Sequence, residues 1–247
     1  MAHDTALDTL KLLADETRWQ LLRALRSSDH QAGELVERVG QPQNLVSYHL
    51  GLLRQAGLVR THRSEADARV LYYALDLAAM RSALRGISAD LQLAAPQPST
   101  IETHALVVFL CTANSARSQM AEGWLRALSQ GRIPVRSAGT EPRTLHPVAV
   151  EVMAEAGVDI SYQQAKDVAA LAGLAPAVLV TVCDRAREVC ATQLRAPHAY
   201  HWSIPDPLRA PADQQPAMFR SVRDELRLRV EGLLSTHLSA NSHDKLP

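Results

Sequence analysis

Apolar residues in the first third of the chain recur mainly at the spacing of an α-helix. Leu7, Leu10 and Ala14, for example, would lie on one face of a first helix. Two β-rich runs around a polar turn follow these helical segments and predict a hairpin. The predicted helices cover residues 7–14, 15–27, 32–39, 44–57 and 76–93, and the predicted hairpin strands cover 58–63 and 69–75.

Helix, turn, helix and hairpin in this order predict a winged helix-turn-helix, whose second helix enters the major groove of DNA. Within the segment 44–57, Val46, Leu50 and Leu53 would face the core. The opposite side carries small or hydrogen-bonding side chains that can read base edges, and nearby arginines can contact phosphates. The predicted DNA-binding residues are Gln43, Asn44, Ser47, Tyr48, His49, Arg54, Arg60, Arg63 and Arg69.

The distribution of charge agrees with a DNA-binding face. The whole chain is neutral, with 26 basic and 26 acidic residues. From Arg38 to Arg85, however, seven arginines stand against three acidic residues, and no acidic residue occurs from Gln41 to Arg63. Such a local excess favours a basic surface for nucleic acid. The alternative is a small helical domain with an ordinary solvated surface.

Three segments of this region resemble the ArsR/SmtB family of winged-helix repressors: LADETRWQLLRAL, LVSYHLGLLRQAGLV and RVLYYAL. The resemblance spans residues 1–93 and implies a homodimer that leaves operator DNA when a metal or metalloid binds. The family's thiolate sensor would fall near Gln31 and Gly33, but residues 1–93 contain no cysteine. No histidine occurs in the last helix, where the family's other sensor would lie. The resemblance therefore implies DNA binding, but not metalloid sensing, by this domain.

From residue 104 onward, β-rich apolar runs alternate with helical segments. This alternation predicts an α/β domain with a parallel four-stranded sheet and helices on both faces. In such sheets the functional site lies at the carboxyl ends of the strands, which is where Cys111 and Cys183 fall. The predicted strands cover 104–111, 133–139, 177–183 and 198–202, and the predicted helices cover 117–130, 146–158 and 213–238.

The polar, proline-containing stretch AAPQPSTIETH between the two patterns indicates a linker. We therefore predict a DNA-binding domain at 1–93, a linker at 94–104, an α/β domain at 105–238 and a flexible tail at 239–247. A chain of 247 residues with 47% hydrophobic content can form two cores. No segment has the pattern of a signal peptide or a membrane span, so we expect a cytoplasmic protein without membrane contact.

The segment VVFLCTANSARSQM joins a predicted strand to a predicted helix. Backbone N–H groups at a helix N-terminus form a nest for a tetrahedral oxyanion, and Arg117 can hold two of its oxygens. The same field stabilises Cys111 as a nucleophilic thiolate. We expect Asn114 to brace the loop and Ser118 to donate to the sulfur. The predicted oxyanion-binding loop comprises Thr112, Ala113, Asn114, Ser115, Ala116, Arg117 and Ser118. The alternative is a structural cysteine beside a surface arginine.

A cysteine in such a loop serves two reactions. Phosphatases hydrolyse a covalent thiophosphate, whereas arsenate reductases use a second thiol to release arsenic as arsenite. Three cysteines are too few for a disulfide scaffold. Cys183 follows a predicted core strand, and Cys190 lies seven residues later in a charged segment that we expect to be mobile. With Cys111 they form a candidate relay, although either residue alone could be an inert thiol.

Residues 104–238 resemble the low-molecular-weight phosphatase fold, and within it the thioredoxin-coupled arsenate reductases. The segments FLCTANSARSQMAEGW, SAGT, VTVCDRAREVC and HWSIPDP carry this resemblance in the family's order. It implies that Asp206 is the general acid. It also implies a Cys111–Cys183 disulfide, then a Cys183–Cys190 disulfide that thioredoxin or another thiol reductant reduces. No tightly bound cofactor is implied.

Three positions depart from relatives of this fold. Gln119 stands where phosphatases usually have proline, and Ala116 replaces a further cysteine of many relatives. Some relatives hold potassium near the loop. Glu122 matches one of its ligands, but Lys166 stands where those relatives have an acid, so we predict no metal site.

The sequence therefore predicts a fused transcriptional repressor and arsenate reductase, which would bind operator DNA, arsenate or a phosphate-like oxyanion, and thioredoxin. Two alternatives remain open. One is a tyrosine phosphatase joined to a DNA-binding domain. The other is a repressor whose C-terminal half senses oxyanions without turnover.

Overall fold

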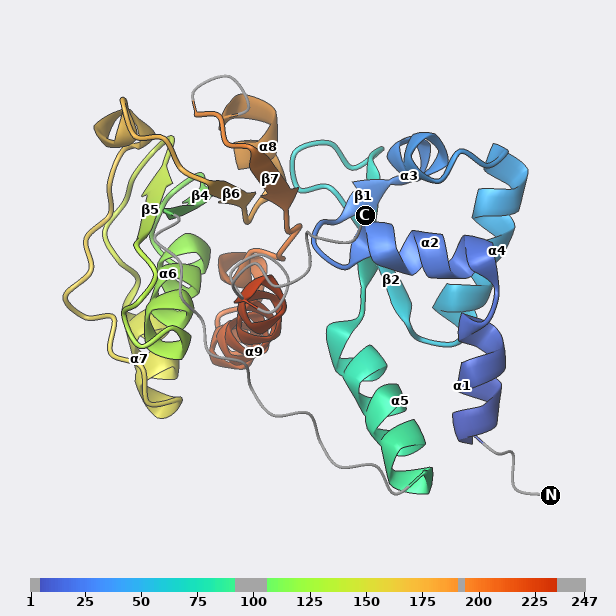
Figure 1. The fold of residues 1–247 in the computed structure, drawn as a ribbon. Helices are drawn as coiled ribbons and strands as arrows, with labels where there is room; N and C mark the ends of the chain where they lie inside the picture. The colour runs from blue at the N-terminus through green and yellow to red at the C-terminus, as the bar shows by residue number, and fades with distance from the viewer. Residues whose placement is uncertain (1–4, 92–105, 191–193, 235–247) are drawn as a thin grey trace, which may run out of the picture. The chain divides into compact units, whose positions relative to one another are not determined.

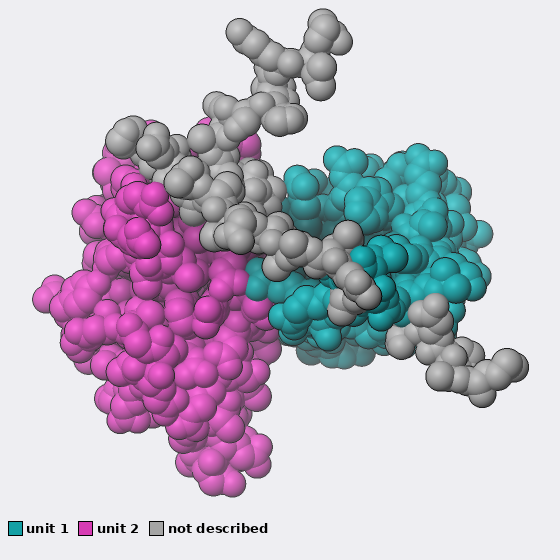
Figure 2. Space-filling model, turned by 60° about the horizontal axis from the view of Figure 1, so that its bottom comes forward, with its two compact units in different colours: residues 1–98 teal, residues 99–247 magenta. Residues whose placement is uncertain are grey.

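A computed structural model describes residues 5–91, 106–190 and 194–234. The chain divides into two compact units, residues 1–98 and 99–247, which Figure 2 shows in different colours. The predicted linker at 94–104 and the predicted tail at 239–247 lie outside the described residues. Among the helices in the described ranges, none is both long enough and apolar enough to cross a membrane.

The first unit is a winged helix-turn-helix, as predicted (Figure 1). Its antiparallel sheet has the order β1-β3-β2, and β2 and β3 form the predicted hairpin. The strand β1 has only two residues and was not predicted, because so short a strand has no periodicity. The elements are α1 (Thr5–Leu13), α2 (Glu16–Leu25), β1 (His30–Gln31), α3 (Ala32–Val39), α4 (Gln43–Gln55), β2 (Val59–Arg63), β3 (Leu71–Leu75) and α5 (Leu77–Asp90).

Local sequence explains how these helices begin and pack. The Asp15 side chain caps α2 by accepting a hydrogen bond from Arg18 N at 2.9 Å, and this bond holds the pKa of Asp15 below its usual value. The three apolar residues of α4 predicted to face the core, Val46, Leu50 and Leu53, are buried. They pack in one core with α2, α3 and the hairpin.

The second unit is an α/β domain with a parallel four-stranded sheet of order β5-β4-β6-β7, again as predicted (Figure 1). The helix α6 packs on β4 and β5 and against α9, whereas α8 packs on β4 and β6. The elements are β4 (Val107–Cys111), α6 (Arg117–Leu128), β5 (Val135–Gly139), α7 (Pro147–Glu155), η1 (Val168–Leu171), β6 (Val178–Thr181), α8 (Asp184–Cys190), β7 (His198–His201), η2 (Pro207–Arg209) and α9 (Gln215–Leu233).

The carboxyl ends of the parallel strands gather the cysteine-bearing segments at one edge of the sheet. Cys111 is the last residue of the central strand β4, and Cys183 follows β6 by two residues. The charged segment before Cys190, which we expect to be mobile, forms the helix α8, and Ala186 in this helix is fully buried. The side chain of Cys190 and residues 191–193 lie outside the described part of the chain.

Candidate functional site

The loop between β4 and α6 turns its carbonyl groups outward. The carbonyls of Thr112, Ala113 and Ser115 accept hydrogen bonds of 2.8–2.9 Å from the backbone N–H groups of residues 141, 143 and 146. The Asn114 carbonyl accepts from Gln119 Nε2 at 3.0 Å. Because C=O and N–H point in opposite directions across a trans peptide, the amides of residues 113–116 point into the loop. The result is a nest of donors at the N-terminus of α6, suited to a tetrahedral oxyanion.

Gly139, at the end of β5, is required for this close packing. A Cβ atom at this position would lie 2.4 Å from the Thr112 carbonyl oxygen and 2.8 Å from Asn114 N. Both contacts are with backbone atoms, which cannot move aside without deforming the loop. The glycine of the SAGT motif therefore lets β5 support the loop directly.

The Cys111 sulfur is buried and faces two hydrogen-bonding groups of the loop. Asn114 N donates to Cys111 Sγ at 3.0 Å, and Ser118 Oγ lies 2.8 Å from the same sulfur. Asn114 Nδ2 donates to Ser118 Oγ at 2.9 Å, so the serine hydroxyl accepts there and can give its own proton to the sulfur. The loop thus presents two hydrogen-bonding groups to the sulfur of the predicted nucleophile.

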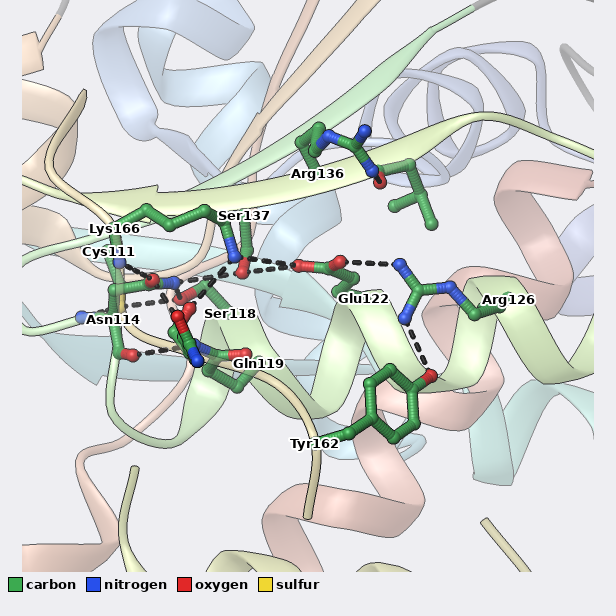
Figure 3. A network of polar contacts seen from close by, with 12 residues as sticks. Cys111, Asn114, Ser118, Gln119, Glu122, Arg126, Arg136, Ser137, Tyr162 and Lys166 are labelled. Atoms are coloured by element: carbon green, nitrogen blue, oxygen red, sulfur yellow. Dashed lines mark hydrogen bonds and ion pairs between the residues drawn. The ribbon is translucent and has the colours of Figure 1, made fainter. Parts of the chain in front are cut away.

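Asn114 is the residue that holds the loop in shape (Figure 3). Its side chain is fully buried, and its φ of 44° lies in the left-handed region, which asparagine tolerates better than most residues. Besides its bond to Ser118, its Nδ2 donates to Ser137 Oγ at 2.9 Å. Its Oδ1 accepts from Lys166 N at 2.7 Å and from Gln119 Nε2 at 3.2 Å. The expected bracing role of Asn114 agrees with this geometry.

Arg117, the first residue of α6, contacts the segment that follows β7. The side chain is buried, and Nη1 donates to the Ile204 carbonyl at 2.8 Å. Nη2 lies 3.1 Å from Asp206 Oδ2. Asp206 thus stands beside the loop on the segment between β7 and η2, and its other carboxylate oxygen accepts from Leu208 N. The structure therefore brings together Cys111, Arg117 and Asp206, which the sequence analysis singled out.

Cys183 lies at the edge of the same loop. Its sulfur is 3.4 Å from Thr112 Oγ1 and accepts from Ala186 N, also at 3.4 Å. Burial raises the pKa of the Cys183 thiol above its ordinary value, and nearby Cys111 adds to the rise, whereas Arg117 and Thr112 oppose it. The raised pKa favours the protonated thiol of Cys183 before the reaction. This thiol lies next to the loop that holds Cys111.

A second polar network runs from the loop to the far end of α6. Ser137 Oγ donates to Glu122 Oε2 at 2.6 Å, and Arg126 Nη2 lies 2.7 Å from Glu122 Oε1 (Figure 3). Lys166 Nζ is 3.8 Å from Glu122 Oε2 and donates to the Gln164 carbonyl. Two cations thus surround one buried carboxylate. We therefore expect no potassium ion here, because the Lys166 ammonium already provides a positive charge and would repel an added cation.

We expect the unfolding temperature of the protein to be the same in potassium chloride and choline chloride at equal ionic strength. In Lys166→Asp, potassium should raise it by about 2–4 °C, which corresponds to ~1 kcal/mol of binding-linked stability in a chain of this size. Differential scanning fluorimetry measures both, with Lys11→Asp as the control. Saturable stabilisation of the unchanged protein by potassium would contradict this assignment.

The DNA-binding residues predicted in the first unit are mostly exposed. Gln43, Asn44, Ser47, Tyr48 and Arg54 lie on the exposed side of α4 or at its ends. On the hairpin, Arg60 is half-buried, and the exposed Arg63 and Arg69 are held by the Ala68 carbonyl and Asp67.

The assignment of His49 to the DNA-binding face is wrong. The residue is 6% exposed, and its Nδ1 lies 3.6 Å from Asp15 Oδ1, the cap of α2. Its position, one turn from Val46 and Leu53, puts it on the core face of α4. His49 therefore lies buried between α4 and the start of α2, and not on the exposed face of α4.

Several contributors to the site were not identified from the sequence. Ser137 lies in the SAGT motif, but the motif alone predicts no contact between Ser137 and Glu122. Ile204 contacts Arg117 through its backbone carbonyl, which no side-chain pattern reveals. Asp184 and His201 form a buried pair beside Cys183, with His201 Nε2 3.0 Å from Asp184 Oδ1. Within the described residues, no group of three or more histidine, cysteine, aspartate or glutamate side chains could hold a metal ion.

Comparisons with known proteins found matches for both units. The family model described as low molecular weight phosphotyrosine protein phosphatase matches residues 106–244, and the model described as bacterial regulatory protein, arsR family, matches residues 15–61. The arsenate reductase of Halalkalibacterium halodurans is 37% identical over 133 residues, which cover 53% of this chain and 96% of the relative. The arsenate reductase of Bacillus subtilis is 39% identical over 139 residues, with the same two coverages. A solved structure described as an arsenate reductase in the phosphate binding state is 33% identical, with a TM-score of 0.46, and covers 55% of this chain and 99% of its own.

Proposed function

Because this chain belongs to the low molecular weight phosphotyrosine protein phosphatase family and carries an arsR-family DNA-binding region, we propose that it is a fused transcriptional repressor and arsenate reductase. The observation that carries the enzymatic part is the second buried thiol, Cys183, at the edge of the loop that holds Cys111. Hydrolysis of a phosphate ester needs one cysteine. A second thiol facing the same loop favours reduction, and the similarity to two arsenate reductases supports this choice.

In the first step, the loop amides and Arg117 hold arsenate, and the Cys111 thiolate attacks arsenic. A bond forms between Cys111 Sγ and arsenic, and one oxygen leaves as water after Asp206 supplies a proton. The contact between Arg117 and Asp206 keeps the acid beside the position of the departing oxygen. Both groups thus act on charge that develops within the loop.

In the second step, the Cys183 thiolate attacks Cys111 Sγ. The sulfur–sulfur bond forms while the sulfur–arsenic bond breaks, and its electron pair passes to arsenic, which leaves as arsenite. Cys190 then attacks Cys183, frees Cys111 and forms a Cys183–Cys190 disulfide, which thioredoxin reduces.

The helix α8 must rearrange during this last exchange. Seven residues of helix span about 10 Å, whereas the Cα atoms of a disulfide lie roughly 4.4–6.8 Å apart. Cys190 ends α8 and Cys183 precedes it directly, so the helix cannot persist unchanged in the disulfide form.

Turnover of purified protein tests the proposal. Steady arsenite production with thioredoxin, thioredoxin reductase and NADPH is the expected result. Hydrolysis of an aryl phosphate at a comparable rate without arsenite production would instead favour a phosphatase. Arsenate binding without turnover, coupled to release from DNA, would favour a repressor that senses oxyanions.

The rate of arsenite formation should rise with pH. Burial raises the pKa of Cys183, and only its thiolate attacks, so the rate should increase up to about tenfold per pH unit below that pKa. The increase should continue beyond the ordinary thiol pKa of about 8.5. Rapid-quench measurement of a single turnover between pH 6 and 10 checks this. A rate that stays constant from pH 7 to 9 would argue against attack by a buried thiol.

We further propose that the first unit binds a two-fold operator as a homodimer. Leu7 and Leu10 on α1 and Leu84 on α5 are 44–50% exposed, and α1 packs against α5. An apolar surface on adjacent helices fits burial against a second copy. In such a dimer the two α4 helices would enter successive major grooves.

Substitutions on the hairpin and on α4 should have different effects on DNA binding. Arg63→Ala should weaken binding to all sequences and reduce the salt slope by about 1, because it removes a phosphate contact. Asn44→Ala should instead change sequence preference, because this exposed side chain lies on α4. Gel-shift titration at two salt concentrations measures both, with Arg185→Ala in the second unit as the control. Equal loss of affinity on all sequences for both variants would contradict base reading by α4.

A further inference from the structure

The residue directly after Cys183 makes a buried polar contact that the proposed reaction does not use. Asp184 is 1% exposed. Its Oδ1 lies 3.0 Å from His201 Nε2 and also accepts a hydrogen bond from Ser203 Oγ. A carboxylate can only accept, so His201 donates through Nε2, while its Nδ1 lies 2.8 Å from Thr181 Oγ1. His201 and Ser203 are themselves 4% and 2% exposed, so the contact is closed to solvent.

The sheet itself places these groups together. Thr181 ends β6 and pairs in register with His201, which ends the neighbouring strand β7. Asp184 begins α8 three residues after Thr181. The start of α8, and with it Cys183, is thus fastened to the end of β7 through side chains.

The segment from His201 to Asp206 also holds the other side of the site. Ile204 O and Asp206 Oδ2 both contact the Arg117 guanidinium, at 2.8 and 3.1 Å. The backbone between these contacts is tight, because Ile204 N donates to Trp202 O at 2.9 Å and both side chains are buried. The segment from His201 to Asp206 therefore contacts Arg117 near one end and Asp184, next to Cys183, near the other.

The Cys183 side chain is buried in the core of the second unit. The contacts with Thr112 Oγ1 and Ala186 N are both 3.4 Å long. The direction of the thiol relative to the loop also depends on how the backbone around Cys183 is held. Asp184, the next residue, ties that backbone to the end of β7 through its contacts with His201 and Ser203.

We propose that Asp184 is a positioning residue, which His201 and Ser203 hold so that the Cys183 thiol faces the oxyanion loop. The inference rests on the proposed reductase function. The step it serves is the attack of Cys183 on Cys111 Sγ, in which two thiols are oxidised to a disulfide and arsenic(V) is reduced to arsenic(III). A displacement of about 1 Å can slow such a step by roughly 100-fold, because the reacting atoms must be aligned.

The test separates the second step from the integrity of the loop. Without reductant, one equivalent of arsenate should yield arsenite in a single turnover, and Asp184→Ala should slow that release at least tenfold. Alkylation of Cys111 by iodoacetamide, read by mass spectrometry, reports the loop and should change less than twofold. Asp184→Asn keeps an acceptor oxygen and should recover much of the rate, and Asp159→Ala, an exposed carboxylate elsewhere in the unit, should have no effect.

A purely structural role for Asp184 predicts a different pattern. If Asp184→Ala slowed arsenite release and Cys111 alkylation by the same factor, or slowed neither, the inference would be wrong. If Asp184→Ala does not fold, Ser203→Ala removes one of the two bonds, and a severalfold slower release with unchanged alkylation is expected. No arsenite from the unchanged protein would refute the proposed function instead.

Discussion

Replacement of Cys111 by serine is expected to abolish both arsenate reduction and any hydrolysis of aryl phosphates, with a loss of roughly 10⁴-fold or more. The loop amides and Arg117 would still bind an oxyanion, but a serine hydroxyl remains protonated where cysteine forms a thiolate. Cys183→Ser and Cys190→Ser should also stop arsenate turnover. Both should keep aryl-phosphate hydrolysis, because the phosphatase reaction uses water in place of the second thiol.

The Cys183→Ser and Cys190→Ser variants should stop the reaction at different steps. In a single turnover, Cys183→Ser should release no arsenite, whereas Cys190→Ser should release one equivalent and accumulate a Cys111–Cys183 disulfide. Coupled assays with thioredoxin and mass spectrometry of unreduced peptides distinguish these states. Normal steady arsenate reduction by Cys190→Ser with thioredoxin would exclude the relay.

Periodicity and local motifs were enough to predict most of the fold. The alternation of apolar runs predicted the four parallel strands, and the segment after Cys111 predicted a loop at a helix N-terminus. These features depend on residues close together in the sequence. The two-residue strand β1 could not be predicted in this way, because its pairing with Tyr72 and Tyr73 is set by the tertiary fold.

The contacts that were missed join residues far apart in the chain. Arg117 and Ile204 are 87 positions apart, and Asp184 and His201 are 17 apart. Only the parallel order of β4, β6 and β7 brings them together. His49 is a different case, because its spacing from Val46 and Leu53 already placed it on the core face. Its buried ring lies beside Asp15, the residue that caps α2.

We propose that the signal that releases this protein from DNA comes from the second unit. Trivalent arsenic binds proteins through two or three thiolates, because a soft centre prefers soft ligands. Residues 1–93 contain no cysteine, whereas Cys111 and Cys183 both lie at the oxyanion loop. The releasing ligand is either arsenite bound to the cysteines or arsenate bound in the loop. Both require that the ligand bind the DNA-free form more tightly than the DNA-bound form.

We therefore expect residues 1–93 alone to keep their DNA affinity within about twofold in arsenite, while the affinity of the full-length protein falls at least tenfold, a coupling of about 1.4 kcal/mol. The first unit has its own core around Leu21, Leu50 and Leu53, which supports separate folding. A full-length variant with serine at Cys111, Cys183 and Cys190 should be as insensitive to arsenite as the isolated unit. Fluorescence anisotropy with operator DNA, arsenite and arsenate measures all three proteins. Release of the isolated unit from DNA by arsenite would contradict this prediction, because it would require an arsenite site built from oxygen or nitrogen ligands in residues 1–93.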